Sequence, residues 1–393
     1  MPPELPRRKT SRYLLFSYVS TVTSVVELLQ TLIRIPSVNP EGDPGVSPNG
    51  EANMADFLEE FLKPLGFQVT QEEALPGRPN LIARAPGSED RPRILLGPHL
   101  DTVSVAGMTI DPYAAEIKDD KVWGRGSSDT KGPMSAMLWG LKENADILAS
   151  LPVAVDFVGF MGEESSQPGS RHFAKHHADE YEFAIAGEPT SLEAVYCTKG
   201  CLWATIETTG LSTHASQPHL GENAILKLTK QIDLLVKDFG VQLAGHTHDV
   251  LGTSTINIGK IKGGTRANIV PDSASAVIDI RTVPALVEKK SGIDLLRDFL
   301  TLAEITTAME FPPMDLKFNH PWIDRLKSIH PDLVLTGAPW FSDASHLAKA
   351  GIPSICLGPG SIDQAHTADE FIKISDLENG ANWFSRLISG LSD

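Results

Sequence analysis

Apolar positions in the first half of the chain alternate between helical and strand-like spacing. They recur every three or four residues over 25–33 and again over 54–61, which predicts two helices. Short apolar runs predict four strands, over residues 80–85, 93–97, 153–160 and 183–187. A helix over 133–148 separates the second strand from the third. Buried strands separated by helices are typical of an α/β fold with a mostly parallel sheet that is covered on both faces.

The middle of the chain has a different pattern. Strand-like alternation over 202–209, 253–261 and 274–281, with helices near 222–237 and 291–303, indicates a smaller α+β module. The earlier rhythm resumes after about residue 311 and ends with a helix over 377–391. The 393 residues therefore predict two domains. The larger one is formed by residues 1–198 and 312–393, and residues 199–311 are inserted into it.

Charge and cysteine content exclude some classes of partner. The 34 basic and 50 acidic side chains give a net charge of −16, which disfavours binding to nucleic acid or to an anionic membrane. No apolar run reaches the roughly 18 residues of a membrane span. Three cysteines without a Cys-x-x-Cys pair favour a reducing, cytoplasmic compartment. Residues 1–20 imitate a signal peptide weakly, and we interpret them as a tail or an alternative start.

Potential metal ligands follow the predicted strands and one glycine-rich turn. They are His99, Asp101, Asp129, Glu163, Glu164, Glu188 and His366. One such residue is more often a cap or a surface group, but coincidence at five successive places is hard to accept. The carboxyl ends of strands are where α/β sheets bind ligands. Imidazoles and carboxylates without a thiolate suit hydrolytic Zn²⁺, Co²⁺ or Mn²⁺, so the pattern predicts a two-metal hydrolase.

The motifs around these residues resemble one known family. They are His-Leu-Asp at 99–101, Gly-Arg-Gly-Ser-Ser-Asp-Thr-Lys-Gly at 124–132, Gly-Glu-Glu at 162–164, Gly-Glu-Pro-Thr at 187–190 and Gln-Ala-His at 364–366. This set resembles the zinc-dependent family of acetylornithine deacetylase, succinyl-diaminopimelate desuccinylase, aminoacylase and glutamate carboxypeptidase. Residues 187–192 and 357–366 are most similar to the acetylornithine deacetylase branch, which implies a role in arginine biosynthesis.

The resemblance implies a role for each residue of the set. Asp129 would bridge two divalent ions, Zn²⁺ in the first place and Co²⁺ as the alternative. His99 and Glu188 would hold one ion, and Glu164 and His366 the other. Glu163 would be the general base, and Asp101 would hold the ring of His99. In the family a cis peptide commonly follows the bridging aspartate, so we expect one at 129–130.

The resemblance also assigns residues in the inserted module, which would be a ferredoxin-like lid and dimerisation domain. His214 matches the histidine that stabilises the oxyanion, and in dimeric relatives it reaches across from the partner. Asn268 and Arg281 match positions that hold the substrate carboxylate. A homodimer is therefore expected. Contacts of Lys199, Arg266 and Asp343 with substrate stay open.

The leading interpretation is a metal-dependent amidohydrolase that removes an acyl group from a small N-acyl amino acid. A succinyl-diaminopimelate desuccinylase and a metallo-carboxypeptidase or dipeptidase are alternatives, because the metal site is shared. A non-catalytic binding protein on the same fold is a third, but the presence of Glu163 together with all five ligands argues against it. The acyl group, the amino acid and the native metal stay open.

Overall fold

Two compact units make up the chain. The computed structural model describes residues 22–41, 43, 50–87 and 90–392. The predicted tail over 1–20 therefore lies outside the described residues. The first unit runs up to Tyr196 and also contains Leu316–Leu335 and Ser342–Asp393. The second comprises Cys197–Asp315 and Thr336–Phe341.

The first unit alternates strands and helices. Its helices are α2 (Val25–Ile33), α3 (Gly50–Leu62), α4 (Lys131–Glu143), α5 (Pro168–His177), α10 (Pro321–Ile329), α11 (Asp343–Lys349) and α12 (Ile374–Gly390), with short 3-10 turns at η1 (Lys63–Leu65), η2 (Ala178–Glu180) and η5 (Ile362–Gln364). Its strands are β1 (Gln68–Leu75), β2 (Arg78–Arg84), β3 (Arg93–Pro98), β4 (Glu116–Lys118), β5 (Lys121–Trp123), β6 (Ala154–Gly159), β7 (Phe183–Gly187), β17 (Ser354–Cys356) and β18 (Phe371–Lys373). Two strands, β8 (Ala194–Thr198) and β16 (Leu335–Ala338), cross the boundary between the units.

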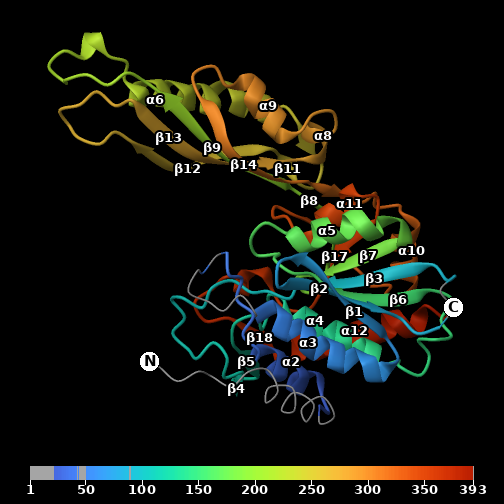
Figure 1. Ribbon diagram of the computed structural model, residues 1–393. Coiled ribbons are helices and arrows are strands. Elements are labelled where there is room, and N and C mark those ends of the chain that lie inside the picture. The colour runs from blue at the N-terminus through green and yellow to red at the C-terminus, as the bar shows by residue number, and fades with distance from the viewer. Residues whose placement is uncertain (1–21, 42, 44–49, 88–89, 393) are drawn as a thin grey trace, which may run out of the picture. The chain divides into compact units, whose positions relative to one another are not determined.

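A large sheet forms the centre of the first unit, with strand order β1-β2-β6-β3-β7-β17-β8. The four strands β6, β3, β7 and β17 are parallel, and the outer pairs are antiparallel. Ile94 and Leu96 pack into one hydrophobic cluster with α2, α3, α4 and α12, whereas Leu95 packs into another with α5 and α11. Figure 1 shows these two sets of helices on opposite faces of the sheet. Both faces of the sheet are thus covered, which confirms the predicted α/β fold.

A small three-stranded sheet joins two distant parts of the first unit. Its order is β18-β5-β4, and it pairs Phe371 with Trp123. The rings of these two residues lie 4.7 Å apart. This pairing brings the residues just before β18 next to the glycine-rich turn that follows β5.

The second unit has the chain order of a ferredoxin-like fold. Its elements are β9 (Gly200–Thr209), η3 (Pro218–Leu220), α6 (Ala224–Leu234), a π-helical turn η4 (Leu235–Phe239), α7 (Gly240–Ala244), β10 (Thr247–His248), β11 (Gly252–Thr253), β12 (Thr255–Gly263), β13 (Ser273–Thr282), α8 (Pro284–Val287), α9 (Gly292–Phe299), β14 (Glu304–Phe311) and β15 (Met314–Asp315). The antiparallel sheet has the order β12-β13-β9-β14, and β9-α6-β12-β13-α9-β14 is the split β-α-β arrangement. The predicted α+β module is confirmed.

Two predicted helices are shorter in the structure. The helix predicted over 133–148 ends at Glu143, because Asn144 caps it with a side-chain hydrogen bond to the carbonyl of Gly140. The helix predicted over 291–303 ends at Phe299, and strand β14 follows it. Among the described residues, no helix is both long and apolar enough to cross a membrane.

Close packing between α4 and α12 depends on a glycine. A Cβ atom at Gly140 would lie 2.9 Å from the carbonyl carbon and the Cβ of Phe384, and 3.0 Å from the amide nitrogen of Ser385. Backbone atoms of α12 cannot give way as a flexible side chain would. The two helices can therefore approach this closely only because residue 140 has no side chain.

We predict that Gly140→Ala destabilises the protein by about 1–3 kcal/mol through overpacking. The same change normally stabilises a helix by up to about 1 kcal/mol. Gly240→Ala is the control, because a Cβ there meets no atom closer than 3.7 Å. Urea unfolding measures both variants, and a Gly140→Ala protein as stable as the parent would contradict the packing argument.

Candidate metal centre

Three neighbouring parallel strands deliver most of the candidate ligands. The register pairs the last residues of β3 and β7, so His99 and Glu188 follow directly and leave the sheet side by side. Strand β6, the other neighbour of β3, leads into Glu163 and Glu164. His99, Glu188 and the pair Glu163 and Glu164 thus all follow the carboxyl ends of neighbouring parallel strands, where α/β sheets bind ligands.

Asp129 lies between two histidines. Its Oδ1 is 3.0 Å from Nε2 of His99, and its Oδ2 is 3.6 Å from Nε2 of His366. The same nitrogen of His366 is 2.9 Å from Oε2 of Glu164. His99, Asp129 and Glu164 each offer a ligand atom within 4.8 Å of the other two. Each oxygen of the Asp129 carboxylate thus lies near a different histidine.

The carboxyl groups of this cluster are buried close together, and the nearby histidines compensate their negative charge only in part. Burial, and next the charge of Glu188, raise the pKa of Glu163. Burial and the charge of Asp129 raise the pKa of Glu188, and raise that of Glu164 to about 7. Burial also raises the pKa of Asp343 to about 7. Buried carboxylates this close together are stabilised by a bound cation.

The donor atoms fit a divalent metal ion. Imidazole nitrogens and carboxylate oxygens are ligands that Zn²⁺ accepts. The buried Oε1 of Glu164 has no hydrogen-bond partner among the described residues, although a buried carboxylate oxygen normally has one. A bound cation would supply a partner for that oxygen.

Asp101 supports the cluster in a broader way than the sequence indicates. Its carboxylate accepts hydrogen bonds from the backbone amides of Glu163 and Glu164, both at 3.0 Å, and from Nδ2 of Asn39 at 2.7 Å. Nδ1 of His99 is 3.0 Å from the backbone carbonyl of Asp101 and 3.4 Å from its Oδ1. Burial lowers the pKa of His99, but Asp101 and Asp129 outweigh burial and raise it.

Glu370 is a supporting residue that the sequence analysis misses. Its buried carboxylate accepts hydrogen bonds from the backbone amides of Gly126, Ser128 and Asp129, at 2.8, 2.7 and 2.9 Å. Nη1 of Arg125 lies 2.9 Å from the same carboxylate. Glu370 therefore fixes the backbone that carries Asp129, whose bond to Thr130 is cis. Its position four residues after His366 was the only hint in the sequence.

The remaining candidate site residues, His214, Asn268 and Arg281, lie at two different places in the second unit. His214 and Asn268 are exposed and adjacent, since the amide of Ala215 donates to the carbonyl of Asn268 at 3.1 Å. Arg281 lies near the other end of β13, eight residues beyond Ser273, which is about 27 Å at about 3.4 Å per residue. Arg281 thus does not meet the other two within this unit.

Neighbours of Arg281 restrict what its guanidinium can bind. Nε and Nη2 lie 2.9 and 3.0 Å from the two carboxylate oxygens of Asp279. The ammonium of Lys199 donates to the carbonyl of Thr253 at 2.6 Å, and its pKa is lowered by burial and by Arg281. Arg266 is exposed in the turn that carries Asn268.

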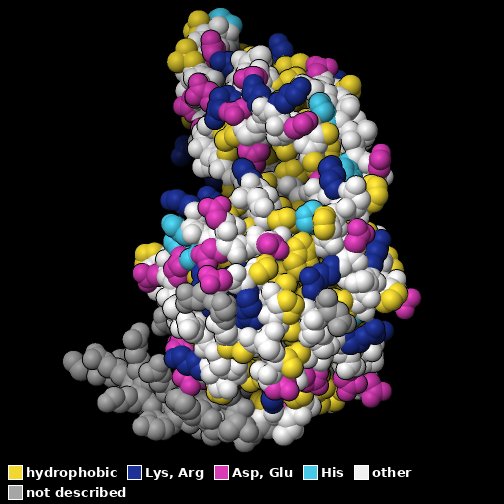
Figure 2. All heavy atoms as spheres, turned by 90° about the vertical axis from the view of Figure 1, so that its right-hand side faces the viewer, with side chains coloured by type: hydrophobic (Ala, Val, Ile, Leu, Met, Phe, Trp, Pro, Cys, Tyr) yellow, Lys and Arg dark blue, Asp and Glu magenta, His cyan; other side chains and the backbone are white. Residues whose placement is uncertain are grey.

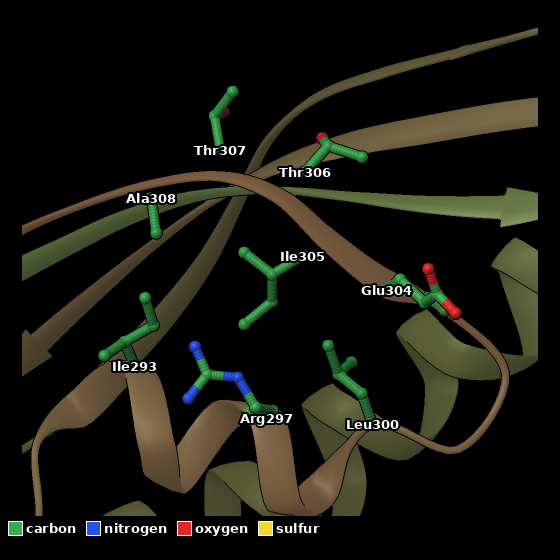
Figure 3. A pocket seen from close by; sticks show the side chains of 9 residues that line it. Ile293, Arg297, Leu300, Glu304, Ile305, Thr306, Thr307 and Ala308 are labelled. Atoms are coloured by element: carbon green, nitrogen blue, oxygen red, sulfur yellow. The ribbon is translucent and has the colours of Figure 1, made fainter.

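A surface pocket of the second unit lies apart from these residues. It has a volume of about 530 Å³, and Figure 3 shows Ile293, Arg297 and Leu300 on one side and β14 on the other. None of the candidate residues lines it.

On the face shown in Figure 2, acidic and basic side chains are interspersed, and no extended patch of basic side chains is visible.

Comparisons with known proteins agree on one family. The sequence pattern of Peptidase family M20/M25/M40 matches residues 95–390. Acetylornithine deacetylase of Vibrio campbellii (strain ATCC BAA-1116) is 30% identical over 92% of this chain and 97% of that protein. A probable carboxypeptidase of Talaromyces marneffei (strain ATCC 18224) is 29% identical over 94% of this chain and 86% of its own length. The structure of an M20 family metallo-carboxypeptidase from Sulfolobus solfataricus has a TM-score of 0.76 at 20% identity, covering 94% of this chain and all of that one. The predicted resemblance is confirmed, and the chain belongs to Peptidase family M20/M25/M40, as a metal-dependent hydrolase of amide bonds.

Proposed function

We propose that this enzyme removes an acyl group, acetyl in the first place, from an N-acyl amino acid. The observation that carries the proposal is the position of Asp129 between His99 and His366 in a cluster of buried carboxyl groups. The similarity to a relative named acetylornithine deacetylase, which extends over nearly the whole of both chains, supports the acyl amino acid as substrate. Arginine biosynthesis in the cytoplasm is the corresponding cellular setting.

We propose that two divalent ions, Zn²⁺ or alternatively Co²⁺, are bound here. His99 and Glu188 would hold one ion, Glu164 and His366 would hold the other, and Asp129 would contribute to both. When bound, such ions lower the pKa of a water molecule and polarise the substrate carbonyl. Support comes from the two Asp129 oxygens, which face different histidines.

Glu163 is the proposed general base. It takes a proton from the attacking water and delivers it to the leaving amine, a role that typically contributes about 10²–10⁴-fold to the rate. Burial and the charge of Glu188 raise its pKa, which makes the carboxylate a better proton acceptor. Nε2 of Gln167 donates to Oε1 of Glu163 at 2.6 Å and orients the group.

The second unit supplies the proposed substrate contacts. His214 donates a hydrogen bond to the carbonyl oxygen as charge develops there, and Asn268 and Arg281 hold the free carboxylate. Arg281 retains Nη1 for this purpose, because Asp279 occupies Nε and Nη2. The distance along β13 between the two ends of the unit supports a homodimer, in which His214 and Asn268 serve the partner's site.

A carboxypeptidase or dipeptidase activity is the second candidate. The 29% identical relative named a probable carboxypeptidase favours it, and a C-terminal dipeptide presents the same amide and carboxylate as an N-acyl amino acid. A hydrolysis panel of N-acetyl, N-succinyl and dipeptide substrates separates the candidates. Our proposal requires the N-acetyl amino acids to have the highest kcat/KM, and a clear preference for dipeptides would replace it.

We predict that Glu163→Gln keeps the bound metal but lowers kcat at least about 10²-fold, because the amide cannot accept the proton. Metal content and steady-state hydrolysis are measured on the same preparation. Glu193→Gln is the matched control, since Glu193 is exposed and outside the cluster. Substantial turnover by the Glu163 variant would remove this residue from the role of base.

We predict that Glu370→Gln also lowers kcat, by about tenfold or more, although Glu370 is not among the residues proposed to contact the substrate. The amide would bring a donor against the backbone amides and weaken at least one hydrogen bond. Metal affinity should fall as well, because Asp129 loses its support. Asp369→Asn is the control, since the neighbouring carboxylate is only partly buried and binds Thr109 instead of the turn that carries Asp129. Equal metal affinity and rate in the two variants would show that Glu370 does not position Asp129.

A further inference from the structure

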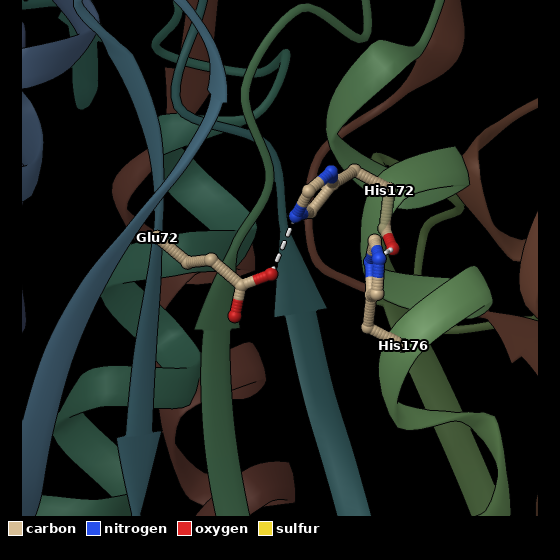
Figure 4. A group of neighbouring side chains, drawn as sticks. All are labelled: Glu72, His172 and His176. Carbon is tan, nitrogen blue, oxygen red and sulfur yellow. Dashed lines mark hydrogen bonds and ion pairs between the residues drawn. The ribbon is translucent and has the colours of Figure 1, made fainter.

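Two histidines of α5 face an acidic side chain of β1, outside the candidate metal centre. His172 and His176 are four residues apart, so they lie on the same side of the helix. Glu72 reaches them from the edge strand of the sheet (Figure 4). Oε1 of Glu72 is 2.5 Å from Nε2 of His172, and the two imidazole rings lie 4.4 Å apart.

The hydrogen bond of His176 leaves one ring nitrogen for a metal. Nδ1 lies 2.8 Å from the backbone carbonyl of His172. Because a carbonyl only accepts, Nδ1 carries the proton, and Nε2 keeps its lone pair when the ring is neutral. That Nε2 makes no hydrogen bond or ion pair with any described residue. A backbone carbonyl in this position is a common partner of metal-binding histidines.

The carboxylate of Glu72 is held in place from its other side. Nε2 of His177 lies 2.9 Å from Oε2 of Glu72, and Nδ1 of His177 lies 2.8 Å from Oε1 of Glu180. Glu180 in turn pairs with Arg84. Such outer partners orient a ligating carboxylate.

The three side chains are close enough to share one ion. Each offers a ligand atom within 4.8 Å of the other two. In a tetrahedral site with bonds of about 2.0–2.2 Å, the ligand atoms lie about 3.3 Å apart. Small side-chain rotations can bring the three ligand atoms from their present separations to this distance. We propose that Glu72, His172 and His176 bind a divalent transition-metal ion such as Zn²⁺, Ni²⁺ or Cu²⁺, with water completing the coordination.

A bound ion here cross-links β1 to α5. The helix begins at Pro168, directly after Gln167, whose side chain contacts Glu163. None of the three ligands belongs to the candidate metal centre. The site is therefore a structural one, and occupation stabilises the folded chain because the unfolded chain does not hold the three groups together.

The test compares Zn²⁺ binding by the full chain and by His176→Ala. His176 is exposed, so its loss leaves the fold and the hydrolytic activity unchanged. His219→Ala is the control, because His219 is an exposed histidine outside the group. Equilibrium dialysis at one free Zn²⁺ concentration counts the ions. Any ions at the candidate metal centre cancel in the difference between variants.

We expect the parent and the His219 variant to bind one more Zn²⁺ per chain than the His176 variant. Added Zn²⁺ should also raise the melting temperature of the parent more than that of His176→Ala. Glu72→Gln, which keeps a hydrogen-bond acceptor but loses the charge, should weaken this binding about tenfold or more. Equal ion counts and equal thermal shifts in the parent and His176→Ala would overturn the proposal, whether or not the enzyme hydrolyses acyl amino acids.

Discussion

Mutual repulsion among buried carboxyl groups is the constraint on which the first unit depends. Burial and like charge raise the pKa values of Glu163, Glu164 and Glu188 at the end of the central sheet. Such a cluster costs free energy unless positive charge or hydrogen-bond donors compensate it. The histidines supply part of this compensation, and the proposed ions supply the rest. The net charge of −16 thus describes the site poorly, because ions would be its largest local charges.

The scaffold around the cluster provides donors where side chains alone would not suffice. Asp101 and Glu370 each collect backbone amide groups, one set from Glu163 and Glu164 and the other from the turn that carries Asp129. Pairing of β18 with β5 brings Glu370 to that turn across a long stretch of chain. The folded backbone therefore fixes the positions of the candidate ligands, which is the condition for a preorganised site.

Local patterns predicted the parts of this arrangement that depend on local sequence. Apolar spacing identified α2 and α3, and continuous apolar runs identified β3 and β7, because both faces of these strands are buried. Candidate ligands such as His99 and Glu188 could be found because they directly follow such strands. The edge strand β1 gave no apolar run, since only one of its first five residues is apolar and none of its residues is fully buried. Glu370 and Asn39 could not be found, because their roles arise from contacts across many residues. The separation of Arg281 from His214 likewise depends on the register of β13 with β9.

Crystals soaked with Zn²⁺ and measured by anomalous X-ray scattering at the zinc edge test the two-metal arrangement most directly. At the candidate metal centre the proposed two-metal site predicts two peaks about 3.5–4 Å apart, one on each side of the Asp129 carboxylate. One peak should lie against His99 and Glu188, and the other against Glu164 and His366. Only one peak, or none, in contact with Asp129 under zinc-replete conditions would contradict the two-metal site.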